Sequence, residues 1–142
     1  MTTTAPSLFQ QEIHVYSEDT DAGGVVFHAN YLKFFERART EWLRSLSVEQ
    51  QALRNRPGVI FVVTDTRVRF HCPARLDDLL DVSVQPVQPV QPLHVRQASM
   101  QFAQQARCGT RLVAEGEIRI GCADQHTFKP RRLPAELLER LP

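Results

Sequence analysis

Cysteine is scarce in this chain, whose 142 residues include three: Cys72, Cys108 and Cys122. Their number is odd and their spacings are wide, so the sequence contains neither a disulfide framework nor a zinc-ribbon pattern. A chain of this length can bury a sizeable core without such cross-links. We therefore expect three small, buried thiols in a reducing compartment.

Uncompensated charge is also lacking, because 17 basic residues oppose 16 acidic ones and leave a net charge of +1. This balance argues against a nucleic-acid-binding protein whose affinity depends on bulk positive charge.

No segment approaches the roughly 20 apolar residues that span a membrane, and residues 1–11 lack the charged and apolar regions of a signal peptide. We expect a cytoplasmic protein with a single domain, residues 1–142, in which residues 1–7 form a loose tail.

Several common catalytic motifs are missing as well. There is no Gly-x-Ser-x-Gly elbow and no glycine-rich phosphate loop, which argues against a serine hydrolase of that kind and against a nucleotide-dependent enzyme. The five histidines are scattered, and no pair has the spacing of a zinc hydrolase, so we expect no metal. His71 and Cys72 are neighbours on an expected strand and point to opposite faces, which disfavours a thiol nucleophile.

The strongest pattern that is present belongs to a long helix beginning near Asn30, a residue that can cap a helix. Apolar residues follow at steps of three and four and form one stripe along the helix. The stripe consists of Tyr31, Phe35, Ala38, Trp42 and Leu46, and it is widened by Leu32, Phe34 and Leu43. So wide an apolar face predicts a helix that is enclosed by other structure.

The second half of the chain has the pattern of β-strands. Residues 111–122 alternate between apolar and polar side chains, and Gly109 marks a turn from the strand before them. Val-Gln-Pro occurs three times within residues 84–92, and because proline cannot donate to a sheet, the strand there must end early, bulge or lie at an edge. The expected elements are strands at 8–16, 59–70, 81–87, 95–107 and 111–122 and helices at 30–46, 48–54 and 134–141. This order predicts an α+β fold in which an antiparallel sheet wraps the long helix.

The greatest density of reactive groups lies in residues 18–31. The carboxylates of Glu18, Asp19 and Asp21 precede two glycines, His28 and the start of the helix. A carboxylate beside unpaired N–H groups at a helix start can attack an acyl carbon, or activate water, while the N–H groups stabilise the oxyanion. The same residues also suit an acidic turn that leads into a capped helix, with Asp19 bonded to the backbone of the turn.

Two segments carry a resemblance to a known family. DTDAGGVVFHANY at residues 19–31, followed by FFERARTE at residues 34–41, resembles the signature of the 4-hydroxybenzoyl-CoA thioesterase family. FHCPARLDDLL at residues 70–80 is a second match, and the branch that looks most similar is that of the bacterial acyl-CoA thioesterases encoded with the Tol–Pal envelope system. The resemblance implies a hotdog fold, with a sheet of five or six strands around the long helix. It also implies homodimers or homotetramers with active sites between subunits.

The resemblance further implies roles for individual residues. Asp21 matches the family's catalytic aspartate, as nucleophile or general base, and His28 occupies the position whose backbone N–H polarises the thioester carbonyl. Oxyanion-binding N–H groups are expected within residues 26–30. Substrate contacts are expected from Gly24, Val25, Asn30 and Tyr31. No cofactor is required, because coenzyme A is part of the substrate.

The phosphates of coenzyme A need cations, and Lys129, Arg131 and Arg132 form a basic cluster that can supply them. The same three residues also fit a solvated surface segment. One departure from the branch is Ser17, where many members have tyrosine. Tyr16 is one position away and would point to the opposite face of a strand.

We therefore predict an acyl-CoA thioesterase that releases a carboxylic acid and free coenzyme A, with no nucleic acid and no membrane span involved. Acyl carrier protein is a second candidate carrier of the acyl group. Two alternatives stay open: a hotdog dehydratase or hydratase acting on acyl carrier protein or CoA substrates, and a non-enzymatic protein that binds acyl ligands.

Overall fold

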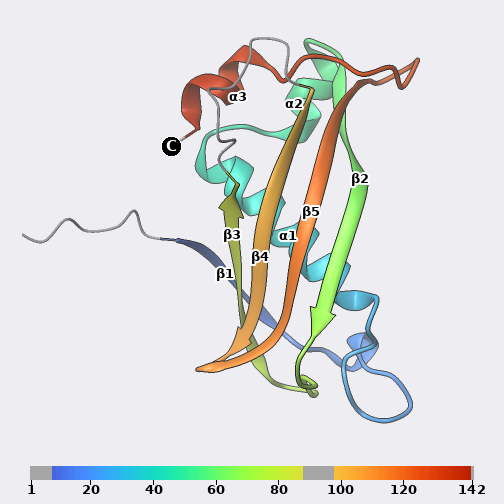
Figure 1. Cartoon of the computed structure of the whole chain (residues 1–142), viewed down its shortest axis with the longest axis vertical. Helices are drawn as coiled ribbons and strands as arrows, with labels where there is room; N and C mark the ends of the chain where they lie inside the picture. The colour runs from blue at the N-terminus through green and yellow to red at the C-terminus, as the bar shows by residue number, and fades with distance from the viewer. Residues whose placement is uncertain (1–7, 88–97, 142) are drawn as a thin grey trace, which may run out of the picture.

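The computed structural model describes residues 8–87 and 98–141, which form five strands, three α-helices and one turn of 3-10 helix (Figure 1). The strands are β1 (Phe9–His14), β2 (Val59–Phe70), β3 (Leu79–Pro86), β4 (Ser99–Cys108) and β5 (Arg111–Asp124). The helices are α1 (Asn30–Ser45), α2 (Gln50–Asn55) and α3 (Ala135–Arg140), and the 3-10 turn is η1 (Ser17–Asp19). The predicted α+β layout is confirmed. The tail expected at residues 1–7 and the start of the strand expected at 95–107 lie outside the described residues.

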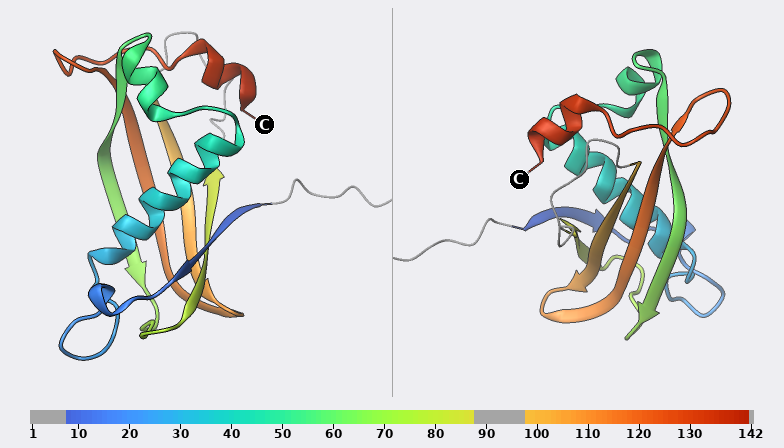
Figure 2. Two further views of the ribbon diagram at one scale, coloured as in Figure 1. Left: turned by 180° about the vertical axis from the view of Figure 1, so that it is seen from behind. Right: turned by 45° about the horizontal axis from the view of Figure 1, so that its top comes forward.

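All five strands join in one antiparallel sheet with the order β1-β3-β4-β5-β2. α1 crosses one face of this sheet, and Figure 2 shows the strands curving around the helix. The predicted turn between β4 and β5 contains Gly109, whose φ of 61° is a conformation that suits glycine. The arrangement is the hotdog fold that the sequence resemblance implies.

The apolar stripe of α1 lies against the sheet, as predicted. The buried apolar residues of the helix are Tyr31, Phe34, Phe35, Ala38, Trp42 and Leu43. Two other members of the predicted stripe differ: Leu32 is 43% exposed, and Leu46 is only partly buried. Both lie at the margin of the face that the sheet covers, which is narrower than the sequence pattern suggests.

The ring of Phe35 on α1 lies against Gly116 of β5. A Cβ atom added to Gly116 would lie 3.0 Å from Cε2 of Phe35, so glycine permits this contact. Ile118 and Ile120 are buried on the same face of β5, whereas Arg119 is exposed on the other face. The alternation predicted for residues 111–122 is confirmed over residues 114–120, whereas at the start of the strand Val113 is buried and Leu112 only partly buried.

One charged residue of α1 is buried, which the helical pattern does not indicate. Arg39 is 8% exposed and donates through Nη1 to Oε1 of Gln104, 2.9 Å away. The amide nitrogen of Gln104 donates to the carbonyl oxygens of Phe35 and Ser83, so the network ties α1 to β3 and β4. Burial lowers the pKa of Arg39 to about 10, against the opposing effect of Glu36, and the guanidinium stays charged at neutral pH.

β2 is the outermost strand on one side of the sheet, with β5 as its sole neighbour among the described strands. It is 12 residues long, and Val62 and Val63 are 39% and 49% exposed. A long edge with exposed apolar side chains is a template for pairing with another chain.

The Val-Gln-Pro repeat begins inside β3, which ends at Pro86, so the prediction of an early strand end is confirmed. β3 lies between β1 and β4, but its pairing with β1 ends at Val84, so at Pro86 the described strand pairs with β4 alone. The remainder of the repeat, residues 88–92, lies outside the described residues.

The three cysteines are free thiols. Cys122 is buried, as predicted, whereas Cys72 and Cys108 are only partly buried. No helix within residues 8–87 and 98–141 has the length and hydropathy needed to span a membrane.

Candidate active site

Residues 20–26 form a closed loop at the N-terminal end of α1 (Figure 1). An antiparallel bridge between Thr20 and Val26 closes its base. Within the loop, the N–H of Asp21 donates to the carbonyl of Val25 at 2.8 Å, and the N–H of Gly24 donates to the carbonyl of Asp21 at 3.0 Å. Gly24 has a φ of 79°, which lets the chain turn back on itself. The loop is thus held in one shape by its own backbone.

The exposed side chain of Asp21 is oriented by this loop. Its Oδ1 accepts a hydrogen bond from the N–H of Gly23 at 2.8 Å and a longer one from the N–H of Val25 at 3.4 Å. Its other oxygen, Oδ2, has no donor among the described residues. The carboxylate is therefore held in place through one oxygen, while the other is accessible to a ligand.

Asp19 is the buried carboxylate of the same segment, at 4% exposure. Its Oδ2 accepts from the N–H of Tyr16 at 2.8 Å, and its Oδ1 accepts from Nδ2 of Asn30 at 2.9 Å. Asn30 is consequently not the helix cap that the sequence suggests: Ala29 is the N-cap residue, and no side chain caps the helix. The prediction was wrong because the side chain of Asn30 is bound by Asp19, a partner that helix signals cannot reveal.

The backbone N–H groups just before α1 differ in whether they have acceptors. The N–H of Phe27 donates to the carbonyl of Asp19, and that of Asn30 donates to the carbonyl of Phe27. Among the described residues, no acceptor is found for the N–H of His28 or of Ala29. Two adjacent free N–H groups at a helix start are a suitable site for developing negative charge.

Two aromatic rings, those of Phe27 and Phe70, form a group with the exposed side chain of His28. The ring of Phe27 lies 4.5 Å from the imidazole, and the ring of Phe70, at the end of β2, lies 6.2 Å away on an edge-to-face geometry. Phe27 and Phe70 are 44% and 51% exposed. Neither residue is among those predicted for the site, although Phe70 begins the second family-like segment. The group brings the end of β2 to the start of α1.

Two of the expected substrate contacts are occupied by protein. Tyr31 is 3% exposed and its hydroxyl oxygen accepts from the N–H of Ala74 at 3.3 Å. Burial raises the pKa of this phenol above its ordinary value. Asn30 is 8% exposed. Gly24 is exposed, with open space where a Cβ would lie, so a ligand can reach its backbone, and Val25 is partly buried in a bridge to Arg75.

The basic cluster lies at the opposite end of the molecule from the acidic loop. Arg131 donates to Oδ2 of Asp124 at 3.0 Å, while Lys129 and Arg132 are exposed. The N–H groups of residues 126 and 127, together with Arg131, lower the pKa of Asp124 to about 2. Asp124 pairs with Val59 at the start of β2, whereas His28 lies near its end. The structure of one chain therefore does not bring the cluster to Asp21.

Ser17 is the position at which this chain differs from the branch that it resembles. Ser17 begins η1, is exposed, and its carbonyl accepts from the N–H and the hydroxyl of Thr20. Tyr16 is 60% exposed.

Within residues 8–87 and 98–141, no group of three or more histidine, cysteine, aspartate or glutamate side chains is arranged to hold a metal ion.

Comparison with known proteins agrees with this architecture. Residues 15–141 match the family model described as the thioesterase-like superfamily. The chain is 42% identical to acyl-CoA thioester hydrolase YbgC of Escherichia coli O157:H7, over 93% of this chain and 94% of that protein. It is 40% identical to acyl-CoA thioesterase YbgC of Haemophilus influenzae, over 91% and 90%. A probable thioesterase from Bartonella henselae superposes with a TM-score of 0.81 at 32% identity, over 90% of this chain and all of that structure.

Proposed function

The chain belongs to the thioesterase-like superfamily and is a thioesterase, and from that premise we propose that it hydrolyses an acyl-CoA thioester at the start of α1 through Asp21. The observation that carries the proposal is the pairing of two features on one short segment. Among the described residues, these are a fixed carboxylate with one oxygen that has no donor and two adjacent N–H groups without acceptors, in His28 and Ala29.

The free N–H groups of His28 and Ala29 are proposed to bind the carbonyl oxygen of the thioester. In the tetrahedral intermediate this oxygen carries a full negative charge, and donors already in place stabilise it without reorganisation. The positive end of the helix dipole adds to the same effect. The imidazole of His28, which lies near the rings of Phe27 and Phe70, is proposed to contact the substrate beside this oxyanion site.

Asp21 is proposed to supply the attacking electron pair in one of two ways. As a nucleophile, its free oxygen bonds to the acyl carbon, the C–S bond breaks, and coenzyme A leaves as a thiolate. Water then hydrolyses the resulting anhydride, which releases the carboxylic acid and regenerates the Asp21 carboxylate, while one proton of the water passes to the thiolate. As a general base, Asp21 takes a proton from water, the water oxygen bonds to the acyl carbon, and the proton passes to the departing thiolate. Both routes give a carboxylic acid and free coenzyme A.

A homodimer would bring the basic cluster to this site. If two copies pair antiparallel along their β2 edges, the start of one β2 lies beside the end of the other. Because Asp124 pairs with Val59 and His28 lies beside Phe70, Lys129, Arg131 and Arg132 of one copy would then lie next to the acidic loop of the other. The cluster could bind the phosphates of coenzyme A there, with Gly24 offering close approach to the loop backbone.

The proposal is tested by thiol release from a panel of acyl-CoA and acyl carrier protein thioesters with short, long and aromatic acyl groups. We expect hydrolysis of at least one class by a particle whose mass from light scattering is at least twice 16.2 kDa. An enoyl-CoA hydration assay serves as the control for the dehydratase alternative. Hydration without thiol release would contradict the proposed reaction, and full activity of a monomer would contradict the shared site.

A further inference from the structure

Phe128 is the most exposed large apolar residue within residues 8–87 and 98–141, at 67%. It lies in the loop between β5 and α3, which projects from the end of the sheet in Figure 2. An aromatic ring in this position forgoes the burial through which such rings usually stabilise a fold. The roles proposed for the acidic loop and the basic cluster do not use this ring.

The backbone at Phe128 has an unusual conformation for so large a side chain. Its φ is 59°, in the left-handed region. Among the described residues, Ser47 and Asp77 are the other non-glycine residues with positive φ, and both have short polar side chains. A bulky residue with this φ is an outlier that costs free energy, and asparagine or glycine would form the same turn more readily. The turn therefore does not require a phenylalanine, and strain of this kind points to a function.

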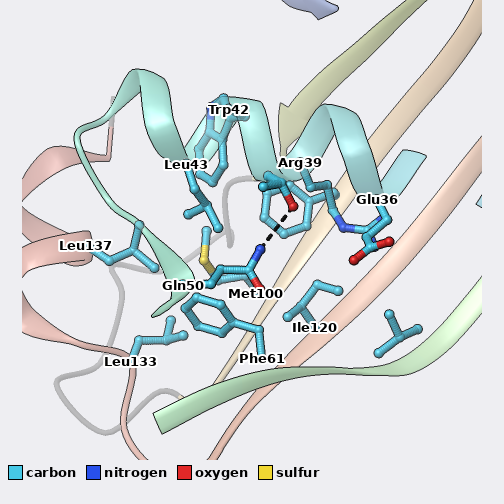
Figure 3. Close-up of a pocket in the computed structure, with 13 residues that line it drawn as sticks. Glu36, Arg39, Trp42, Leu43, Gln50, Phe61, Met100, Ile120, Leu133 and Leu137 are labelled. Carbon is cyan, nitrogen blue, oxygen red and sulfur yellow. Dashed lines mark hydrogen bonds between the residues drawn. The ribbon is translucent and has the colours of Figure 1, made fainter. Parts of the chain in front are cut away.

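The loop that carries Phe128 is fixed around Asp124. Oδ1 of Asp124 accepts from the N–H groups of His126 at 2.9 Å and Thr127 at 3.0 Å, and its carbonyl accepts from the N–H of Phe128 at 3.0 Å. After the loop, Leu133 is buried in the wall of the cavity between α1 and the sheet (Figure 3). Because the backbone is anchored on both sides, little conformational entropy is lost when a ligand binds to the ring.

Cations adjoin the ring of Phe128 in the same loop. Lys129 follows it directly, and Arg131 is bound to Asp124 through Oδ2 at 3.0 Å. Lys129 and Arg132 are exposed, and neither side chain has a hydrogen-bond or ion-pair partner in the described part of the chain. A flat apolar ring beside unpaired cations is suited to a nucleotide, because the base stacks on the ring while the phosphates pair with the cations.

From the exposure, the strain and the adjoining cations we propose that Phe128 stacks on the adenine ring of coenzyme A. The inference rests on the proposed function, in which the basic cluster of one copy serves the acidic loop of the other. Coenzyme A joins an adenosine 3′-phosphate through a pyrophosphate to pantetheine, so its base and its anionic groups lie together, away from the thioester. Phe128 thereby favours acyl-CoA over a carrier without adenine, such as acyl carrier protein.

The kinetic test compares thioesters with and without the nucleotide. Phe128→Asn removes the ring and suits a positive φ. We expect its KM for acyl-CoA to rise at least about fivefold, equal to about 1 kcal/mol, with kcat within about twofold of wild type. For the corresponding acyl-pantetheine, which lacks the nucleotide, the two proteins should have the same KM. Phe128→Tyr keeps a ring and should retain the wild-type KM for acyl-CoA. Equal increases for both thioesters, or none for either, would overturn the inference.

Stability separates a binding role of the ring from a structural one. Since asparagine relieves the strain and the ring packs on nothing, the free energy of unfolding of Phe128→Asn in urea should equal or exceed that of wild type. The mass from light scattering should be unchanged. A less stable or dissociated variant would assign the ring to the fold or to a contact between subunits, and would overturn the inference.

A binding test needs no catalysis. In isothermal titration calorimetry we expect adenosine 3′,5′-bisphosphate to bind the wild-type protein and to bind Phe128→Asn at least about fivefold more weakly. Equal or undetectable binding to both proteins, when the wild type hydrolyses acyl-CoA, would overturn the inference and leave the proposed function standing. Binding that depends on Phe128 in a protein that hydrolyses no thioester would support the stacking site and contradict the proposed function.

Discussion

Asp19 and Asp21 are separated by one residue, yet the first is 4% exposed and the second lies on the surface. Both oxygens of Asp19 accept hydrogen bonds, one from the N–H of Tyr16 beside η1 and one from Asn30 at the start of α1. Asp21 keeps one oxygen without a donor in the described part of the chain. A carboxylate whose oxygens are both held by protein donors stabilises the fold but cannot approach an acyl carbon. The comparison therefore separates, within a single loop, an aspartate whose carboxylate is held by the fold from one whose carboxylate is accessible to a ligand.

The largest effect is expected from Asp21→Asn, which keeps the shape of the side chain and removes its charge. The variant should fold and assemble normally, with kcat lowered by at least about 10³, a rise in the barrier of about 4 kcal/mol. Steady-state kinetics and circular dichroism measure the two parts. If this variant kept more than a tenth of wild-type turnover while Asp19→Asn was inactive, the catalytic role would belong to Asp19 and not to Asp21. Single-turnover hydrolysis in ¹⁸O-labelled water places label in Asp21 only if it is the nucleophile.

Asp19→Asn should show the opposite pattern, with a large effect on stability and a small one on chemistry. The substitution removes the charge from two hydrogen bonds, and bonds to charged groups contribute about 1.5–3 kcal/mol each. We expect the free energy of unfolding, measured by urea denaturation, to fall by about 2 kcal/mol. In the remaining folded protein kcat should stay within about tenfold of wild type, or about 1.4 kcal/mol. An unchanged free energy of unfolding would show that Asp19 has no structural role.

The basic cluster is tested by a triple variant in which Lys129, Arg131 and Arg132 are replaced by alanine. The question is whether these charges, which lie far from both aspartates, affect the binding of acyl-CoA and not its turnover. KM for acyl-CoA should rise more than kcat falls, and the increase should shrink at high salt, because screening already weakens the wild-type contacts. Arg131→Ala alone is the control for the lost pair with Asp124. An unchanged KM at low salt would show that the cluster is a solvated surface segment that does not bind acyl-CoA.

The smallest effect is expected from Ser17→Ala. Ser17 is exposed, and it supports η1 through its carbonyl, which alanine retains. Its hydroxyl is a poor acid and base near neutral pH. Activity should remain within about tenfold of wild type. A thousandfold loss in a folded variant would give this position a part in proton transfer.

The periodic elements could be predicted from the sequence because their signals are local. The apolar stripe predicted a helix at 30–46, where α1 spans Asn30–Ser45, and the β-branched run at 59–70 matches β2 residue for residue. The identity of the acidic loop as the candidate site also followed from a contiguous segment. Asp19 is buried and Asp21 is exposed, and the division of roles between them stays a prediction.

The features that the sequence did not predict depend on contacts between distant residues. Asn30 binds Asp19 instead of capping α1, and Arg39 is buried because Gln104, 65 residues away, accepts its hydrogen bond. Phe70 reaches His28 only because β2 ends beside the start of α1. A helical pattern specifies which side of a helix is apolar, but not how far a sheet extends over it, so the exposure of Leu32 was also missed.

The placement of the basic cluster and the acidic loop at opposite ends of β2 has a genetic consequence. In an antiparallel dimer, each site combines the loop of one copy with the cluster of the other. A mixed dimer of an Asp21→Asn chain and a chain without the basic cluster therefore contains one site with both defects and one with neither. Co-expression of the two chains should restore hydrolysis at low acyl-CoA concentration to a level that neither homodimer reaches. Failure of such complementation in confirmed mixed dimers would mean that each site is built from a single chain.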